Sequence, residues 1–148
     1  VFAKSLPMPI VVGALKRLEL IRTQPELKAK LWHNVNRLQN GLKESGFNIG
    51  VTNTPVTPVF LSGGLFDAVQ LIFDMRENHN IFCSVVVYPV IPKGQIMLRL
   101  IPTAVHTDED IDTTLEVFKK LRTKLDNKEY PQEITKLNRS KKWHTQEM

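Results

Sequence analysis

Apolar residues recur at helical spacing in the first third of the chain. They run from Ile10 to Ile21, break at residues 24–25, and resume at Leu27, Leu31, Val35, Leu38 and Leu42. Intervals of three and four residues place apolar side chains on one face of a helix. The pattern predicts two helices, or one bent helix, with Thr23 capping the second segment and Gly46 ending it.

Shorter apolar runs in the middle of the chain are typical of strands. Residues 47–51, 58–61, 81–88 and 95–101 are rich in β-branched and aromatic side chains and are bounded by Pro, Gly, Asn and Thr. These boundary residues favour turns. A helix is expected over residues 65–78, between the second and third strands.

A final helix is expected to begin after Thr107. The threonine hydroxyl can cap the helix, and three acidic residues follow it directly. Negative charge is favourable at the amino end of a helix. The buried face is predicted from the apolar positions Ile111, Leu115, Phe118, Leu121 and Leu125.

Arg99 stands out in the strand predicted over residues 95–101. Strand alternation puts Ile96, Leu98 and Leu100 on one face, and Arg99 on the other face beside Met97 and Ile101. An arginine on an apolar surface needs an anion, because an unpaired buried charge is costly. The anion could be an internal carboxylate or a bound ligand, or the side chain could reach water at the end of the strand.

The composition is that of one globular domain. The chain has 148 residues, of which 42% are hydrophobic and 24% charged, and its net charge is +5. Part of the excess charge lies in residues 127–148, predicted to be a polar, basic and poorly packed tail. Such a tail is usually a solvated segment, but it could contact the phosphates of CoA or nucleic acid. The chain lacks the interleaved aromatic and basic residues of a nucleic-acid-binding surface. The single Cys83 excludes an internal disulfide and is expected to be buried.

No apolar run reaches the length of a transmembrane helix, and no signal segment is recognisable. The protein is therefore expected to be cytoplasmic and not an integral membrane protein. The first residues, Val-Phe-Ala-Lys-Ser-Leu-Pro, have the character of an internal segment, so the chain is expected to be a fragment of a longer protein.

Residues 88–107, Tyr-Pro-Val-Ile-Pro-Lys-Gly-Gln-Ile-Met-Leu-Arg-Leu-Ile-Pro-Thr-Ala-Val-His-Thr, closely resemble the C-terminal signature of the α-oxoamine synthases. These enzymes use pyridoxal phosphate (PLP) to condense an amino acid with an acyl-CoA. The resemblance implies that Arg99 binds the carboxylate of the amino acid. It also implies that the loop containing Tyr88, Pro89 and Pro92 borders the substrate pocket.

A second, weaker resemblance involves the start of the chain. Residues 2–7 are similar to a family segment that reaches the PLP phosphate of the partner subunit, which implies a homodimer and a phosphate contact by Ala3, Lys4 or Ser5. Ala3 occupies the usual hydroxyl position, so Lys4, Ser5 or backbone N–H groups would have to replace that contact. An unstructured terminus is the alternative.

The element order predicts an α+β fold with a mostly antiparallel sheet covered by helices. This agrees with the small C-terminal domain of fold type I, aminotransferase-like PLP enzymes. Residues 1–9 would be an extended remnant of the large PLP domain of the same chain. Residues 10–126 would form the small domain, with a long interdomain helix at its start.

The resemblance implies a parent acyltransferase acting on glycine or serine, of the glycine C-acetyltransferase (2-amino-3-ketobutyrate CoA ligase) or serine palmitoyltransferase type. Val87 stands where some serine palmitoyltransferases carry an arginine, which weakens the palmitoyl interpretation. Neither Lys4 nor Lys93 lies in the context of the family's PLP-binding lysine, so the chain contains no catalytic residue and should be inactive alone. No metal site is expected, and His106 is interpreted as a loop residue. The alternative is a non-catalytic α+β binding or dimerisation domain.

Overall fold

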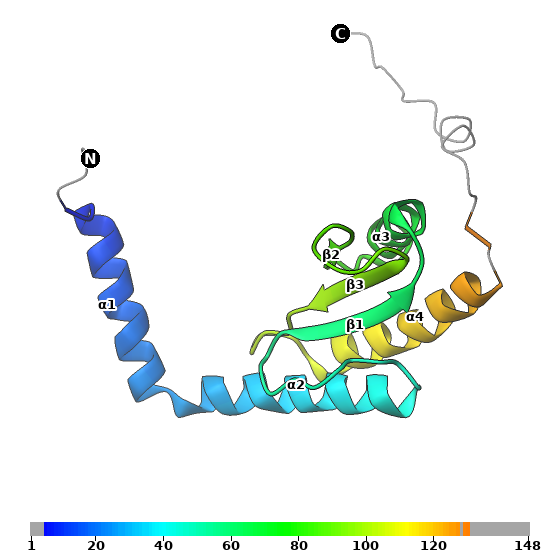
Figure 1. The fold of residues 1–148 in the computed structure, drawn as a ribbon. Coiled ribbons are helices and arrows are strands. Elements are labelled where there is room, and N and C mark those ends of the chain that lie inside the picture. The colour runs from blue at the N-terminus through cyan, green and yellow to red at the C-terminus, as the bar shows by residue number, and fades with distance from the viewer. Residues whose placement is uncertain (1–4, 128, 131–148) are drawn as a thin grey trace, which may run out of the picture.

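The structure, a computed structural model, describes residues 5–127, 129 and 130 of the chain (Figure 1). The elements follow in the order α1 (Met8–Thr23), α2 (Pro25–Glu44), β1 (Thr57–Ser62), α3 (Leu65–His79), β2 (Ser84–Val86), β3 (Gln95–Leu100) and α4 (Asp108–Asp126). The domain boundaries expected at residues 9 and 126 stay predictions.

The two N-terminal helices are separate and meet at a bend. Figure 1 shows α1 standing away from the rest of the fold, and none of its residues is buried. The expected cap at Thr23 is wrong, because Gln24 holds the N-cap position of α2. The Thr23 hydroxyl instead donates to the Glu19 carbonyl one turn back, at 2.9 Å. Gly46 follows the end of α2 with φ of 76°, a conformation that glycine adopts without strain.

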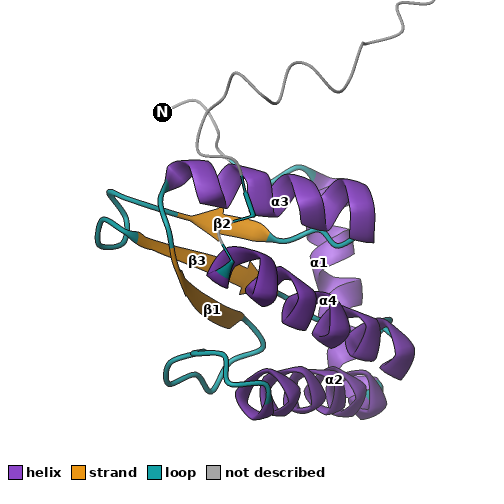
Figure 2. Ribbon diagram, turned by 90° about the vertical axis from the view of Figure 1, so that its right-hand side faces the viewer, coloured by secondary structure: helices purple, strands orange, loops and turns teal. Residues whose placement is uncertain are grey.

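The sheet has three antiparallel strands in the order β1-β3-β2, so β3 lies in the middle (Figure 2). The alternation predicted for β3 is confirmed. Ile96 and Leu98 are fully buried, whereas Arg99 is exposed. Val59 and Val85 both pair with Leu98, so they share its inner face.

One hydrophobic core forms on this inner face. Helices α2, α3 and α4 contribute Leu42, Leu71 and Phe118, each no more than 1% exposed. Phe118 also packs edge-on against Phe47, with ring centroids 5.7 Å apart. The predicted α+β architecture with an antiparallel sheet covered by helices is confirmed, and the helices that enter the core lie against its inner face.

Two predicted strands differ from those observed. Residues 47–51 form only an isolated bridge between Asn48 and Phe60. The chain turns there, because the Asn48 side chain accepts a hydrogen bond from the N–H of Gly50, which has φ of 60°. The strand predicted over residues 81–88 shortens to Ser84–Val86. A turn closed by the Val90 N–H and the Val87 carbonyl limits its end.

The capping of α4 by Thr107 is confirmed. Its hydroxyl accepts from the N–H of Asp110 at 3.1 Å, and its own N–H donates to the Asp110 carboxylate at 2.8 Å. Beyond this helix, Tyr130 is only 8% exposed, which contradicts the expected poor packing at that position. The rest of the basic tail from residue 131 onwards lies outside the described residues.

Candidate substrate-binding site

Arg99 lies on the outer face of the central strand. Its Cα partners are Pro58 on β1 and Ser84 on β2. The guanidinium Nε donates a hydrogen bond to the Ser84 hydroxyl at 3.0 Å. Within the described part of the chain, no carboxylate forms a salt bridge with Arg99, so the interpretation of an internal ion pair has no support there. The exposed guanidinium is available to an external anion.

The loop predicted to border the pocket joins β2 to β3. Tyr88 is 65% exposed at its start, and the bond between Tyr88 and Pro89 is cis. The N–H of Gln95 donates to the Pro92 carbonyl at 3.3 Å where β3 begins. Val86 pairs with Met97 next to the loop, whereas Ser84 pairs with Arg99, so Arg99 lies at the end of the β2-β3 pair away from the loop. Arg99 is two residues further along β3 than Met97, or about 7 Å.

Of the residues predicted to contact the cofactor phosphate, Ser5 alone belongs to the described part of the chain. Ala3 and Lys4 fall outside the described residues. Ser5 is exposed and precedes α1, whose first turn is far from the sheet in Figure 1. Within this chain, Ser5 and Arg99 are not brought together. A phosphate contact by Ala3, Lys4 or Ser5 therefore stays a prediction.

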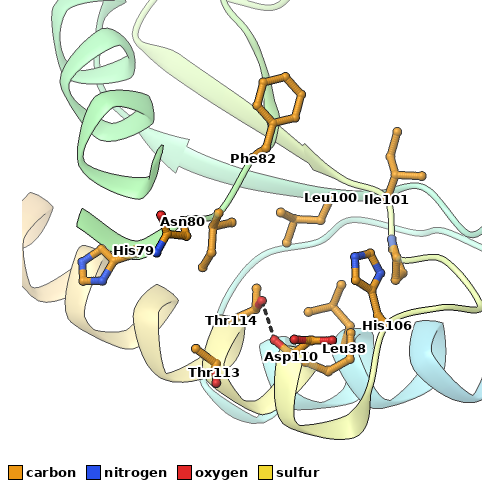
Figure 3. Close-up of a pocket in the computed structure, with 13 residues that line it drawn as sticks. Leu38, His79, Asn80, Phe82, Leu100, Ile101, His106, Asp110, Thr113 and Thr114 are labelled. Atoms are coloured by element: carbon orange, nitrogen blue, oxygen red, sulfur yellow. Dashed lines mark hydrogen bonds between the residues drawn. The ribbon is translucent and has the colours of Figure 1, made fainter. Parts of the chain in front are cut away.

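A separate cavity of about 460 Å³ lies beside the carboxyl end of β3 (Figure 3). Phe82, Leu100 and Ile101 lie on one side of it, and His106 and Asp110 on another. Two of its titratable groups already have partners. The His106 Nδ1 accepts the N–H of Thr103 at 2.9 Å, and Asp110 caps α4. None of the residues predicted to bind substrate lines this cavity, and His106 acts as a loop residue.

Other reactive side chains in the described residues have structural roles. Cys83 is 7% exposed, and burial raises the pKa of its thiol to about 11, so it is not an activated nucleophile. His33 lies on the surface with its Nε2 3.0 Å from an Asp108 oxygen. Among the described residues, no three His, Cys, Asp or Glu side chains gather in a way that could hold a metal ion.

Asn34 has a positioning role that the sequence analysis missed. Its side chain is fully buried in α2, and its amide donates to the carbonyls of Thr103 and His106, each at 2.8 Å. These bonds fix the segment that leaves β3 after Arg99. The available signal was an asparagine on the buried face of a helix, three residues after Leu31 and four before Leu38.

The chain has relatives among known proteins. The chain is 65% identical over 129 residues to a cysteate-C-fatty acyltransferase of Capnocytophaga ochracea, a match covering 87% of the chain and 31% of that relative. It is 34% identical over 125 residues to an 8-amino-7-oxononanoate synthase of Exiguobacterium sibiricum, covering 84% of the chain and 32% of the relative. No family model matches the sequence.

The fold has a counterpart among solved structures. A serine palmitoyltransferase of Sphingomonas wittichii superimposes with a TM-score of 0.75 at 26% identity, covering 88% of this chain and 32% of that one. The domain is therefore of the kind found at the C-terminus of fold type I PLP enzymes.

More specifically, the sequence is homologous to a C-terminal portion of the α-oxoamine synthases, which confirms the family suggested by residues 88–107. The chain spans about a third of the length of the relatives it matches. Related enzymes of this family depend on PLP, and structures of serine palmitoyltransferase with PLP are among the neighbours. No helix in the described residues is long and apolar enough to cross a membrane.

Proposed function

We propose that this chain is the substrate-binding C-terminal part of a PLP-dependent acyltransferase that joins an amino acid to a fatty acyl group. The observation that carries the proposal is the 65% identity over 129 residues to a cysteate-C-fatty acyltransferase. The match covers 87% of this chain.

Cysteate is the first candidate for the amino acid, since the relative's name specifies it. The resemblance in residues 88–107 suggested glycine or serine instead, so serine with a long acyl chain is the second candidate. The likeness to a serine palmitoyltransferase at 26% identity favours this second candidate over glycine. Both candidates carry an α-carboxylate, so both require an anion-binding group.

Arg99 is proposed to bind that carboxylate. Its guanidinium is exposed, its Nε is hydrogen-bonded to Ser84, and its terminal N–H groups can form a two-pronged contact with a carboxylate. Such a contact holds the α-carbon in one orientation and neutralises the negative charge. The loop with Tyr88, Pro89 and Pro92 would form the border of the same pocket.

PLP would supply an electron sink for bond changes at the α-carbon. In the reaction the carbon–hydrogen bond of the α-carbon would break, a carbon–carbon bond would form between the α-carbon and the acyl carbon, and the carbon–sulfur bond of the thioester would break, so that the thiolate leaves and takes up the proton lost from the α-carbon. We expect the 148-residue chain to be inactive alone, because its lysines do not match the PLP-binding segment of the family. Ala3, Lys4 or Ser5 would contact the cofactor phosphate across a homodimer.

A large domain of the same protein is the proposed partner of the exposed surfaces. Helix α1 carries exposed apolar side chains at Met8, Ile10, Val12, Leu15, Leu18 and Ile21, each more than half exposed. Apolar rows of this kind are normally covered by another part of the protein. The relatives are about three times as long as the matched region, which leaves ample chain to cover them.

The test uses the parent-length protein purified with PLP. L-cysteate, L-serine and glycine are each combined with acetyl-CoA and palmitoyl-CoA, and release of the CoA thiol is followed. We expect release with a long acyl-CoA and cysteate. Release only with serine or only with glycine would identify the other members of the family. Absence of release and of borohydride-trapped PLP would favour a non-catalytic α+β binding domain.

A further inference from the structure

Ser84 is the polar neighbour of Arg99 on the open face of the sheet. The two residues are Cα partners on β2 and β3, and the Arg99 Nε donates to the Ser84 Oγ at 3.0 Å. Strand pairing alone brings them together, since they lie fifteen positions apart in the sequence. Nothing in the chemistry proposed above requires a hydroxyl at this position.

The surroundings of Arg99 make this contact significant. On the same face, the paired and diagonal neighbours Pro58, Phe60, Val86 and Met97 all carry apolar side chains. Pro58, the Cα partner on the other side, has no polar side chain to offer. Within the described residues, Ser84 therefore provides the side-chain hydrogen bond that orients the guanidinium.

We propose that Ser84 is a positioning residue that holds Arg99 ready for the anionic group of the amino acid. A bond at Nε fixes the plane of the guanidinium and leaves the two terminal nitrogens free to donate. A long arginine side chain loses conformational freedom when it binds a ligand, and prior orientation reduces that loss. This inference rests on the proposed function and identifies a residue that sets amino-acid affinity.

The experiment measures amino-acid binding to the PLP-loaded, parent-length protein by calorimetry and by the change in PLP absorbance. The probes are L-cysteate and L-serine. Ser84→Ala should raise the Kd of the bound amino acid roughly tenfold, the effect of one hydrogen bond to a charged group. Ser84→Thr keeps the hydroxyl and should bind within about twofold of the wild type, and kcat should change less than KM in both variants.

Ser62→Ala is the matched control. Ser62 is on the same outer face, paired with Gln95 at the far end of β1, and it should bind amino acid as the wild type does. In an Arg99→Lys background the effect of Ser84→Ala should largely disappear, because lysine has no Nε–H donor of this kind.

The outcomes separate this inference from the proposed function. If wild type binds the amino acid and Ser84→Ala binds equally well, Ser84 has no positioning role and the inference is wrong. The same conclusion follows if Ser84→Thr is as weak as Ser84→Ala. If no amino acid binds to the wild-type protein at all, the proposed function fails and the inference fails with it.

Discussion

The Tyr130 hydroxyl donates a hydrogen bond to the Asp74 carboxylate at 2.8 Å, which fastens the chain beyond α4 onto α3. The same carboxylate receives bonds from Lys124 and Asn78, both at 2.7 Å. Asp74 is 8% exposed, so these donors replace the water that a carboxylate would otherwise bind. Three segments of the chain therefore meet at one buried charge.

Tyr130→Phe should lower the free energy of unfolding of this chain by about 1 to 2 kcal/mol, because a buried carboxylate loses one donor. Urea denaturation followed by circular dichroism measures the change. Tyr88→Phe is the matched control, since Tyr88 is largely exposed in the loop and should leave the stability unchanged. Equal stability of Tyr130→Phe and the wild type would show that the contact contributes nothing.

Acid should weaken the same cluster. Burial alone would raise the pKa of Asp74, but the hydrogen bonds from Asn78, Lys124 and Tyr130 outweigh burial and hold the pKa below its usual value. The unfolded chain therefore takes up this proton first as the pH falls. The stabilisation is complete above the unfolded pKa, near 3.9, and is lost as the pH falls through the lower folded value.

The measurement is urea denaturation of the wild type and Asp74→Asn at a series of pH values. The stability difference between them should shrink as the pH falls below about 4. Asp126→Asn serves as a comparison, because the ion pair between Asp126 and Arg122, at 3.7 Å, is exposed. If the stability difference between the wild type and Asp74→Asn stays constant from neutral to strongly acidic pH, the assigned direction of the Asp74 pKa shift is wrong.

Asn34→Ala should cost about 1 to 3 kcal/mol of stability, because the carbonyls of Thr103 and His106 both lose their donor. Asn34→Asp should cost more, since it sets a carboxylate against two carbonyl oxygens. The exposed neighbour Asn36→Ala is the control and should be near neutral. If thermal unfolding shows that Asn34→Asp is more stable than Asn34→Ala, the Asn34 amide is not the donor to these carbonyls.

Arg99→Ala in the parent-length protein should raise KM for the amino acid roughly a hundredfold, through loss of a charged, two-pronged contact. The KM of Arg99→Lys should lie between those of the wild type and Arg99→Ala, because an ammonium group keeps the positive charge but cannot form the two-pronged contact. Steady-state kinetics measure the effect. Arg76→Ala, on the exposed side of α3, controls for the general loss of positive charge. Unchanged KM in Arg99→Ala would remove Arg99 from the substrate site.

The helices and the central strand could be predicted because each depends on a periodic apolar pattern within a short window. The face assignment of Arg99 followed from alternation alone. The prediction of a strand over residues 47–51 was wrong because the chain turns at Asn48 and Gly50. The hydrogen bond to the Asn48 side chain outweighs the strand propensity of these residues. Thr23 failed as a cap for a similar reason, since its hydroxyl bonds backward to Glu19.

The contacts that define the candidate site could not be predicted in this way. Ser84 meets Arg99 only because β2 and β3 pair in one register, and a shift of one residue would turn Ser84 to the core. Tyr130 meets Asp74 from 56 positions away. No local sequence pattern predicts the register of the strands or the position of Tyr130 beside α3. The family resemblance supplied Arg99, but it did not supply the residue that orients it.

Helix α1 has a practical consequence for work on this chain. Since α1 has no buried residue, its aliphatic row is exposed to solvent when the chain is prepared by itself. Preparations at high concentration should associate through this row, and light scattering would report it. Starting the chain at Pro25 would remove the row and keep every residue of the core cluster, which makes the shorter version the better specimen for crystallisation or NMR.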